Sequence, residues 1–141
     1  MIGAGLSLDQ APPISAPLRF FFTAPLFILI SGIVLLFKDM TLLKTDPATI
    51  ALVHLFTLGV FSMVMFGAIQ QMLPVLAGVR IRNALLVAKS AHLFLSAGTL
   101  LFCLAFLGEM SAWLVRLASL FLLLAFAIVL GSALYAMKDV E

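Results

Sequence analysis

Four long apolar segments separated by short polar breaks constrain the fold of this chain more than any other feature. The hydrocarbon core of a bilayer is about 30 Å thick, and a helix needs about 20 apolar residues to cross it. The chain has 141 residues, of which 65% are hydrophobic and 10% are charged, whereas soluble domains average about 25% charged residues. The sequence therefore predicts an all-α integral membrane protein that crosses the bilayer four times.

The polar breaks set the bounds that we expect for the spans. Asp46 followed by Pro47 combines a good N-cap with the residue best tolerated at the first helical position. Pro74 and Gly78 mark the exit from the same span. The expected spans are residues 19–37, 47–73, 84–107 and 111–137. They leave no room for a second folded unit, so the whole chain (1–141) is interpreted as a single transmembrane domain.

Basic residues near the span ends predict the orientation, because Lys and Arg favour the cytoplasmic side of a membrane. Five of them fall on one side, namely Arg19, Arg80, Arg82, Lys89 and Lys138, and three on the other, namely Lys38, Lys44 and Arg116. This excess predicts that both termini are cytoplasmic. The basic residues form no run, which excludes a nucleic-acid partner.

His54 lies near the outer end of the second span, where burying an imidazole in lipid is costly. The rise of an α-helix places it roughly 10 Å below the membrane surface. On an unbroken helix Phe61 and Met65 follow on the same face as His54. Gly59 and Gly67 have no side chains, which leaves space beside neighbouring parts of the helix. Two roles stay open. His54 either hydrogen-bonds to another helix or binds a metal, in an apolar pocket of Phe61 and Met65 that would admit a haem.

His92 belongs to a polar stripe on the third span. Residues spaced three and four apart share one helix face, which must point into the bundle. The stripe consists of Lys89, His92, Ser96, Thr99 and Cys103, and Gln70 and Gln71 are expected at a similar depth. The stripe is either polar glue between helices or a second ligand or proton-pathway site, and the sequence leaves both interpretations open.

The two histidines are not expected to share one iron. The second and third spans are antiparallel, which puts His54 outside the midplane and His92 inside it, roughly 15–20 Å apart at 1.5 Å per residue. Axial nitrogens lie only about 2 Å from an iron on either side, so a pair of ligands must lie at nearly the same depth. A haem held by His54 therefore has no opposite ligand, a weak one such as water, or one from another copy of the chain.

The segment HLFTLGVFSMVMFGAIQQMLPVLAG, which begins at His54, resembles the second transmembrane helix of the catalytic subunits of haem–copper oxidases and nitric oxide reductases. It is also similar to stretches of NnrS-type membrane haem proteins. The shared points are a histidine near the outer end, a Gly- and Met-rich middle and a proline close to the exit. In those families the matching histidine is an axial haem ligand, and the resemblance gives that role to His54 alone.

The same resemblance implies an assembly and a location. The catalytic subunits of that family arrange twelve helices as three four-helix arcs, and this chain has the length of one arc. It lacks the paired histidines that hold copper in the oxidases. The resemblance thus implies a homo-oligomer in the bacterial inner membrane, such as a trimer that imitates the three arcs. Copies of His54 would then lie at one depth around a haem b.

Three functions follow from these observations. The first is a b-type haem protein of the haem–copper-oxidase-like type, which transfers electrons or handles nitric oxide or oxygen, with a redox partner or quinol. The second is a scaffold or accessory subunit without haem. The third is a small proton or solute carrier that uses Lys89, His92 and the glutamines, although no span is clearly broken as in transporter sites. Whether the chain is an enzyme stays open.

Overall fold

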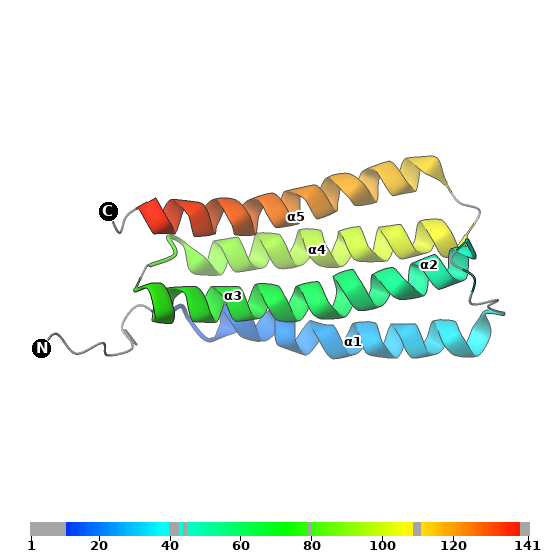
Figure 1. Cartoon of the computed structure of the whole chain (residues 1–141), viewed down its shortest axis with the longest axis horizontal. Helices are drawn as coiled ribbons and strands as arrows, with labels where there is room; N and C mark the ends of the chain where they lie inside the picture. The colour runs from blue at the N-terminus through cyan, green and yellow to red at the C-terminus, as the bar shows by residue number, and fades with distance from the viewer. Residues whose placement is uncertain (1–10, 40–42, 44, 79, 109–110, 139–141) are drawn as a thin grey trace, which may run out of the picture.

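The chain folds into four long helices that lie side by side (Figure 1). The computed structural model describes residues 11–39, 43, 45–78, 80–108 and 111–138. The helices are α1 (Ser15–Phe37), a rod made of α2 (Pro47–His54), the π-helical segment η2 (Leu55–Phe61) and α3 (Ser62–Ala77), then α4 (Ala84–Leu107) and α5 (Ala112–Lys138). Four helices are long and apolar enough to span a membrane. The chain is therefore a multi-pass membrane protein, and the all-α prediction is confirmed.

Helix α2 begins at the capping signal expected from the sequence, Asp46 followed by Pro47. The side chain of Asp46 accepts a 3.0 Å hydrogen bond from the backbone N–H of Ala48, and Pro47 opens the helix. Asp46 thus satisfies one of the N–H groups that the first turn of a helix leaves without a partner. The third span has the expected bounds, and α5 begins and ends one residue later than expected.

Two further helix ends each differ from the expected spans by four residues. The first helix begins at Ser15 rather than at Arg19, four residues before the apolar run. The second span continues through Pro74 to Ala77, and Gly78 follows in the left-handed conformation with φ of 65°. A proline inside a helix removes a single N–H, whereas a left-handed glycine turns the chain away from the helix axis. Gly78 rather than Pro74 therefore ends the span.

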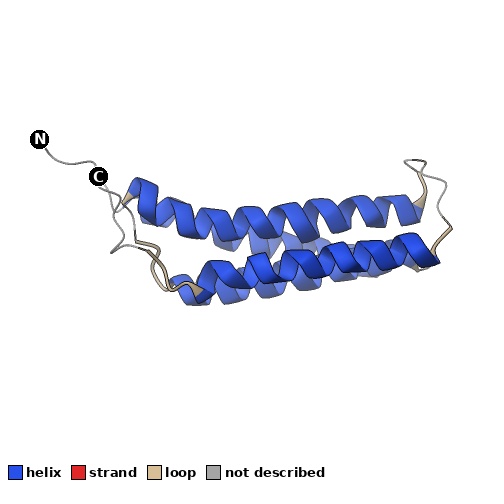
Figure 2. Cartoon of the chain, turned by 90° about the horizontal axis from the view of Figure 1, so that it is seen from below, coloured by secondary structure: helices blue, strands red, loops and turns tan. Residues whose placement is uncertain are grey.

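Successive spans run in opposite directions, so α1 begins and α5 ends at the same end of the molecule (Figures 1 and 2). That end, called the basic end below, carries Arg19, Arg80, Arg82, Lys89 and Lys138. Lys38 and Arg116 lie at the other end, and Lys44 lies outside the described residues. The terminal residues 1–10 and 139–141 are also outside them. The charge asymmetry agrees with the predicted grouping, while the cytoplasmic location of the basic end stays a prediction.

Helices α1 and α4 run parallel and in step. The hydroxyl oxygen of Thr23 lies 2.7 Å from Nε2 of His92, and Nζ of Lys38 donates to the carbonyl oxygen of Leu107 at 3.2 Å. Both pairs join residues that are 69 positions apart in the sequence. The two helices therefore keep one register from the basic half of the bundle to the opposite end.

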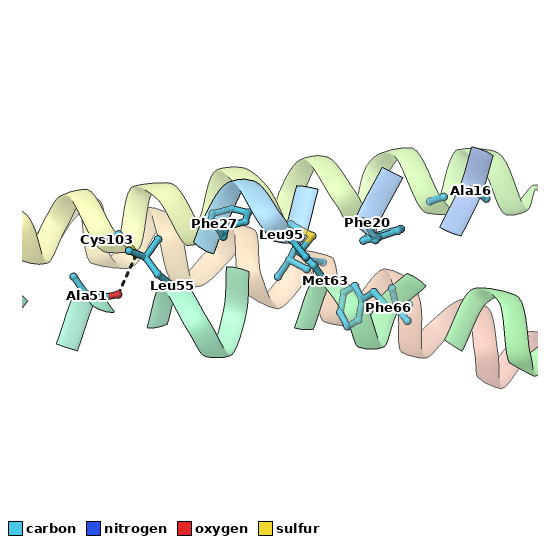
Figure 3. Close-up of a cluster of buried hydrophobic side chains, with 14 of the residues drawn as sticks. Ala16, Phe20, Phe27, Ala51, Leu55, Met63, Phe66, Leu95 and Cys103 are labelled. Atoms are coloured by element: carbon cyan, nitrogen blue, oxygen red, sulfur yellow. Dashed lines mark hydrogen bonds between the residues drawn. The ribbon is translucent and has the colours of Figure 1, made fainter. Parts of the chain in front are cut away.

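A buried core joins α1, the second span and α4 (Figure 3). Gly59 in η2 lies directly against Phe27 of α1, because a Cβ at position 59 would come 2.5 Å from Cγ of that ring. Farther along, the rings of Phe20 and Phe66 meet edge to face with centroids 6.1 Å apart. Glycine permits such a close approach between membrane helices, so Gly59 sets the distance between α1 and the second span.

Helix α5 packs mainly against α4 and forms one side of the molecule. Leu122 fills the space above Gly98, where a Cβ would lie 2.9 Å from Cγ of the leucine. Phe126 reaches the second span and meets Phe66 with ring centroids 4.9 Å apart. The large apolar side chains on the rest of α5 are mostly exposed, which leaves a wide surface of this helix to lipid or to another chain.

Candidate functional site

The hydrogen bond of His54 selects one tautomer of its neutral ring. Nδ1 lies 2.7 Å from the backbone carbonyl oxygen of Ile50, one turn earlier on α2. A carbonyl oxygen only accepts, so Nδ1 carries the hydrogen and donates it. The lone pair of the neutral imidazole is then on Nε2, which bonds to no described residue. His54 thus presents a free nitrogen lone pair at membrane depth.

Helix α4 supplies an aromatic wall beside this ring. Phe102 packs on His54 with ring centroids 4.5 Å apart and a tilt of 35°, and Phe106 continues the stack at 4.8 Å. On the inner side of the same turns, the thiol of Cys103 donates to the carbonyl oxygen of Ala51 at 3.6 Å (Figure 3). These contacts hold the imidazole against α4, and they leave its other side half-buried at the surface of the chain.

The π-helical segment η2 begins directly after His54. The backbone N–H and the hydroxyl of Ser62 both donate to the carbonyl oxygen of Thr57, five residues earlier. Such a segment inserts about one extra residue, which rotates everything below it by about 100° relative to an unbroken helix. The π-helix is rare, and it occurs mostly as short bulges that are frequent at functional sites.

This extra residue changes the surroundings expected for His54. Phe61 and Met65 were placed below it by an unbroken helical period, which η2 interrupts. Both side chains are turned outward and are 60% and 59% exposed. Gly59 and Gly67, which would keep the helix thin for a haem, are covered by Phe27, Phe20 and Phe21 of α1. The space beside the glycines therefore belongs to α1, and a haem pocket that includes Phe61 and Met65 stays a prediction.

His92 makes a different kind of bond. Thr23 of α1 donates its hydroxyl hydrogen to the carbonyl oxygen of Arg19 at 2.8 Å. The hydroxyl oxygen of Thr23 also lies 2.7 Å from Nε2 of His92. Because the hydroxyl hydrogen is already used, the imidazole is the donor in this pair. The edge of the ring also contacts Phe20, with centroids 5.4 Å apart. These contacts favour the interpretation of His92 as polar glue between α4 and α1, because its Nε2–H donates from one helix to the other and its ring packs on Phe20.

The two histidines lie far apart along the bundle. His54 packs on Phe102, which follows His92 by ten residues on the same helix. At 1.5 Å per residue, this separates the imidazoles by about 15 Å along the axis. The separation agrees with the expectation that one chain does not place both histidines on the same iron.

Other polar residues of the predicted stripe are bonded locally or not at all. Thr99 is fully buried and donates to the carbonyl oxygen of Leu95 at 2.8 Å. The hydroxyl of Ser96 and both amide atoms of Gln70 are buried without a partner among the described residues. Gln70 therefore does not bond to the stripe, and Gln71 is exposed. Nothing in the sequence separates a satisfied glutamine from an unsatisfied one.

The described residues contain no group of three or more His, Cys, Asp or Glu side chains that could hold a metal ion. A bare ion needs several such ligands from the protein. A haem differs, because its porphyrin supplies the equatorial nitrogens and the protein supplies only axial ligands. His54 alone therefore fits a haem iron better than it fits a free metal ion.

The hydrogen bond between Thr23 and His92 has a measurable effect on stability. Thr23→Val keeps the shape of the side chain and removes the hydroxyl that joins α1 to α4. We expect it to lower the free energy of unfolding by about 0.6 kcal/mol and by no more than about 1.7 kcal/mol, the range for such bonds in membrane proteins. Unfolding in mixed detergent micelles measures the change, and Ser119→Ala, which removes an exposed hydroxyl bonded within α5, is the control. An equal loss in both variants would show that the bond contributes nothing specific.

No family model, curated protein or solved structure matches this chain.

Proposed function

We propose that this chain is a membrane-embedded b-type haem-binding protein in which Nε2 of His54 is an axial ligand of the iron. The observation that carries the proposal is the 2.7 Å hydrogen bond from Nδ1 to the carbonyl oxygen of Ile50. Histidines that bind metals usually donate their other N–H to a carbonyl or carboxylate, which fixes the tautomer and orients the ring. Phe102 holds the imidazole from the side, so little ordering remains when the iron binds.

The proposed haem lies between copies of the chain rather than inside one. His54 is half-buried, and two apolar neighbours on the second span, Val53 and Phe56, are 50% and 37% exposed. One copy therefore offers a ligand and apolar surface on one side of a haem only. His92 lies about 15 Å from His54 along the axis and is bonded to Thr23, so it does not supply the second ligand. A second copy would place another His54 at the same depth and cover the other side.

This arrangement supports a role in electron transfer or in handling a small gas such as nitric oxide or oxygen. A haem b supplies a one-electron couple, and an iron with a weak second ligand also binds diatomic gases. The resemblance to one four-helix arc of a haem–copper oxidase supports a homo-oligomer, such as a trimer, in the bacterial inner membrane with both termini cytoplasmic. A quinol or a redox protein would be the electron partner.

An absorption spectrum of the protein purified with its native lipid tests the proposal. We expect a reduced-minus-oxidised haem b band, and the pyridine haemochrome assay should give one haem or less per chain if copies share it. A homo-oligomer in the same preparation supports the shared site, and a monomer that retains haem contradicts it. If the folded protein contains no haem after expression with excess haem, the proposal is wrong and a scaffold without haem explains the fold better.

A further inference from the structure

A basic cavity lies at the basic end of the molecule, far from His54. Its volume is about 930 Å³, and it opens between the residues that lead into α1 and the turn that joins α3 to α4. Its lining contains Arg80, Arg82 and Lys89, together with Asn83 and Leu86. Three cations around one cavity at the edge of a membrane helix bundle point to an anionic ligand.

None of these cations forms an ion pair with a described residue, and the described carboxylates, Asp39 and Asp46, lie at the other end of the molecule. The turn that carries the arginines is nonetheless held in place. Ile81, between Arg80 and Arg82, is buried against α4 and α5 and only 5% exposed. The backbone that carries the arginines is therefore held in place, while their charged groups make no ion pair within the described part of the chain.

The first turn of α4 adds partial positive charge to the same cavity. Asn83 precedes the helix in the left-handed conformation, with φ of 52°, and its side chain makes no capping hydrogen bond. Asparagine at this position normally accepts from an N–H of the first turn. Ala84 and Leu85, the first two residues of the helix, also line the cavity. An anion there meets the positive end of the helix as well as the three cations.

We propose that this cavity binds the phosphate of an anionic glycerophospholipid with a hydroxylated headgroup, such as phosphatidylglycerol. A second cavity of about 390 Å³ shares Arg82, Asn83 and Leu86 with the first and adds Ser132 and Tyr135 of α5. These hydroxyls suit a glycerol headgroup, while Arg82 stands at the border between the two cavities. The site is independent of the proposed haem, since none of its residues contacts His54.

A lipid fits better than a free phosphate ester because an apolar strip leads away from the cavity along α4. Leu86 lines both cavities and is 65% exposed. Leu93 and Leu100 follow at intervals of seven residues, which keeps them on one helix face, and they are 64% and 39% exposed. An acyl chain can lie on this strip while the phosphate remains with Arg80, Arg82 and Lys89.

Native mass spectrometry of the delipidated full-length protein, titrated with phosphatidylglycerol in a neutral detergent, tests the site. We expect one tightly held lipid per chain, and much weaker binding of phosphatidylcholine. Arg82→Gln is expected to weaken phosphatidylglycerol binding about fivefold, and Arg80→Gln combined with Arg82→Gln about 25-fold. Lys138→Gln removes an exposed charge from the same end outside both cavities, so it should bind like the unmodified chain.

The outcomes are distinct. Equal phosphatidylglycerol binding by the double variant and Lys138→Gln, with unchanged helix content by circular dichroism, overturns the site. If glycerol 3-phosphate binds at the same concentration as the lipid, and the same variants lose this binding, the ligand is a soluble phosphate ester and the proposal of a lipid is wrong. If the double variant misfolds, binding is compared between Arg82→Gln and Arg82→Lys instead. Arg82→Lys keeps the charge and should retain most of the binding.

Discussion

His54→Ala should remove the reduced-minus-oxidised haem band completely, while His92→Ala should leave it in place. The alanine variant lacks the Nε2 lone pair that we propose as the iron ligand, and the described residues place no other histidine at that depth. Nε2 of His92 donates to Thr23 on α1. The imidazole of His92 lies about 15 Å from that of His54 along the axis. Spectra of the two variants, purified in parallel and normalised to protein, measure the difference.

His92→Ala is also the control for general damage, because His92 contacts Phe20 and Thr23 inside the bundle. If it folds less well than His54→Ala and still retains haem, the loss in His54→Ala is specific. A band that survives His54→Ala but vanishes in His92→Ala would identify His92 as the ligand and contradict the proposed assignment to His54. Adding imidazole to His54→Ala gives a further readout, since a free ligand that restores the band shows that the site itself is intact.

Gly59→Val should strongly destabilise the packing of α1 on the second span. A Cβ at position 59 would lie 2.5 Å from Cγ and 2.9 Å from Cβ of Phe27, and this ring is only 2% exposed. Moving only the end of the phenylalanine does not relieve a contact at its Cβ. Overpacking of this kind costs about 1–3 kcal/mol and sometimes more. Denaturation in mixed micelles, followed by circular dichroism, measures the loss.

Gly131→Val is the matched control, because it makes the same change in a membrane helix where a Cβ meets nothing within 4 Å. The control should stay within about 0.5 kcal/mol of the unmodified chain, as expected for a surface substitution. If the two variants are equally stable, Gly59 does not set the approach of α1, and the close contact with Phe27 relaxes without cost. A smaller side chain opposite, as in Phe27→Ala, should partly rescue Gly59→Val.

The spans could be predicted from the sequence because their signals are local. Apolar length, the cap at Asp46 and the glycine at position 78 each act within a few residues, and the helices follow them closely. Pro74 was the exception. It was expected at the helix exit, yet it lies fully buried inside α3, because membrane helices tolerate a proline in their interior.

The surroundings of the histidines could not be predicted in the same way. Helical periodicity assumes one turn length throughout, and nothing in the letters LFTLGVF announces the π-helical turns of η2. The partners of His54 and His92, namely Phe102 and Thr23, lie on other helices. Only the tertiary arrangement chooses such partners. The axial separation of the two histidines, by contrast, depends on counting along a helix, and this part of the sequence argument agrees with the structure.

The packing of the helices also bears on how the protein enters the membrane. The second span packs on α1, α4 packs on both, and α5 packs mainly on α4. Proteins are made from the N-terminus onward, and early parts fold first. Each new helix thus finds its main partner among the helices made before it, an order that permits assembly by successive addition. Because α1 and α4 keep a constant offset of 69 residues, the hairpin of α1 and the second span acts as a template for the depth of α4.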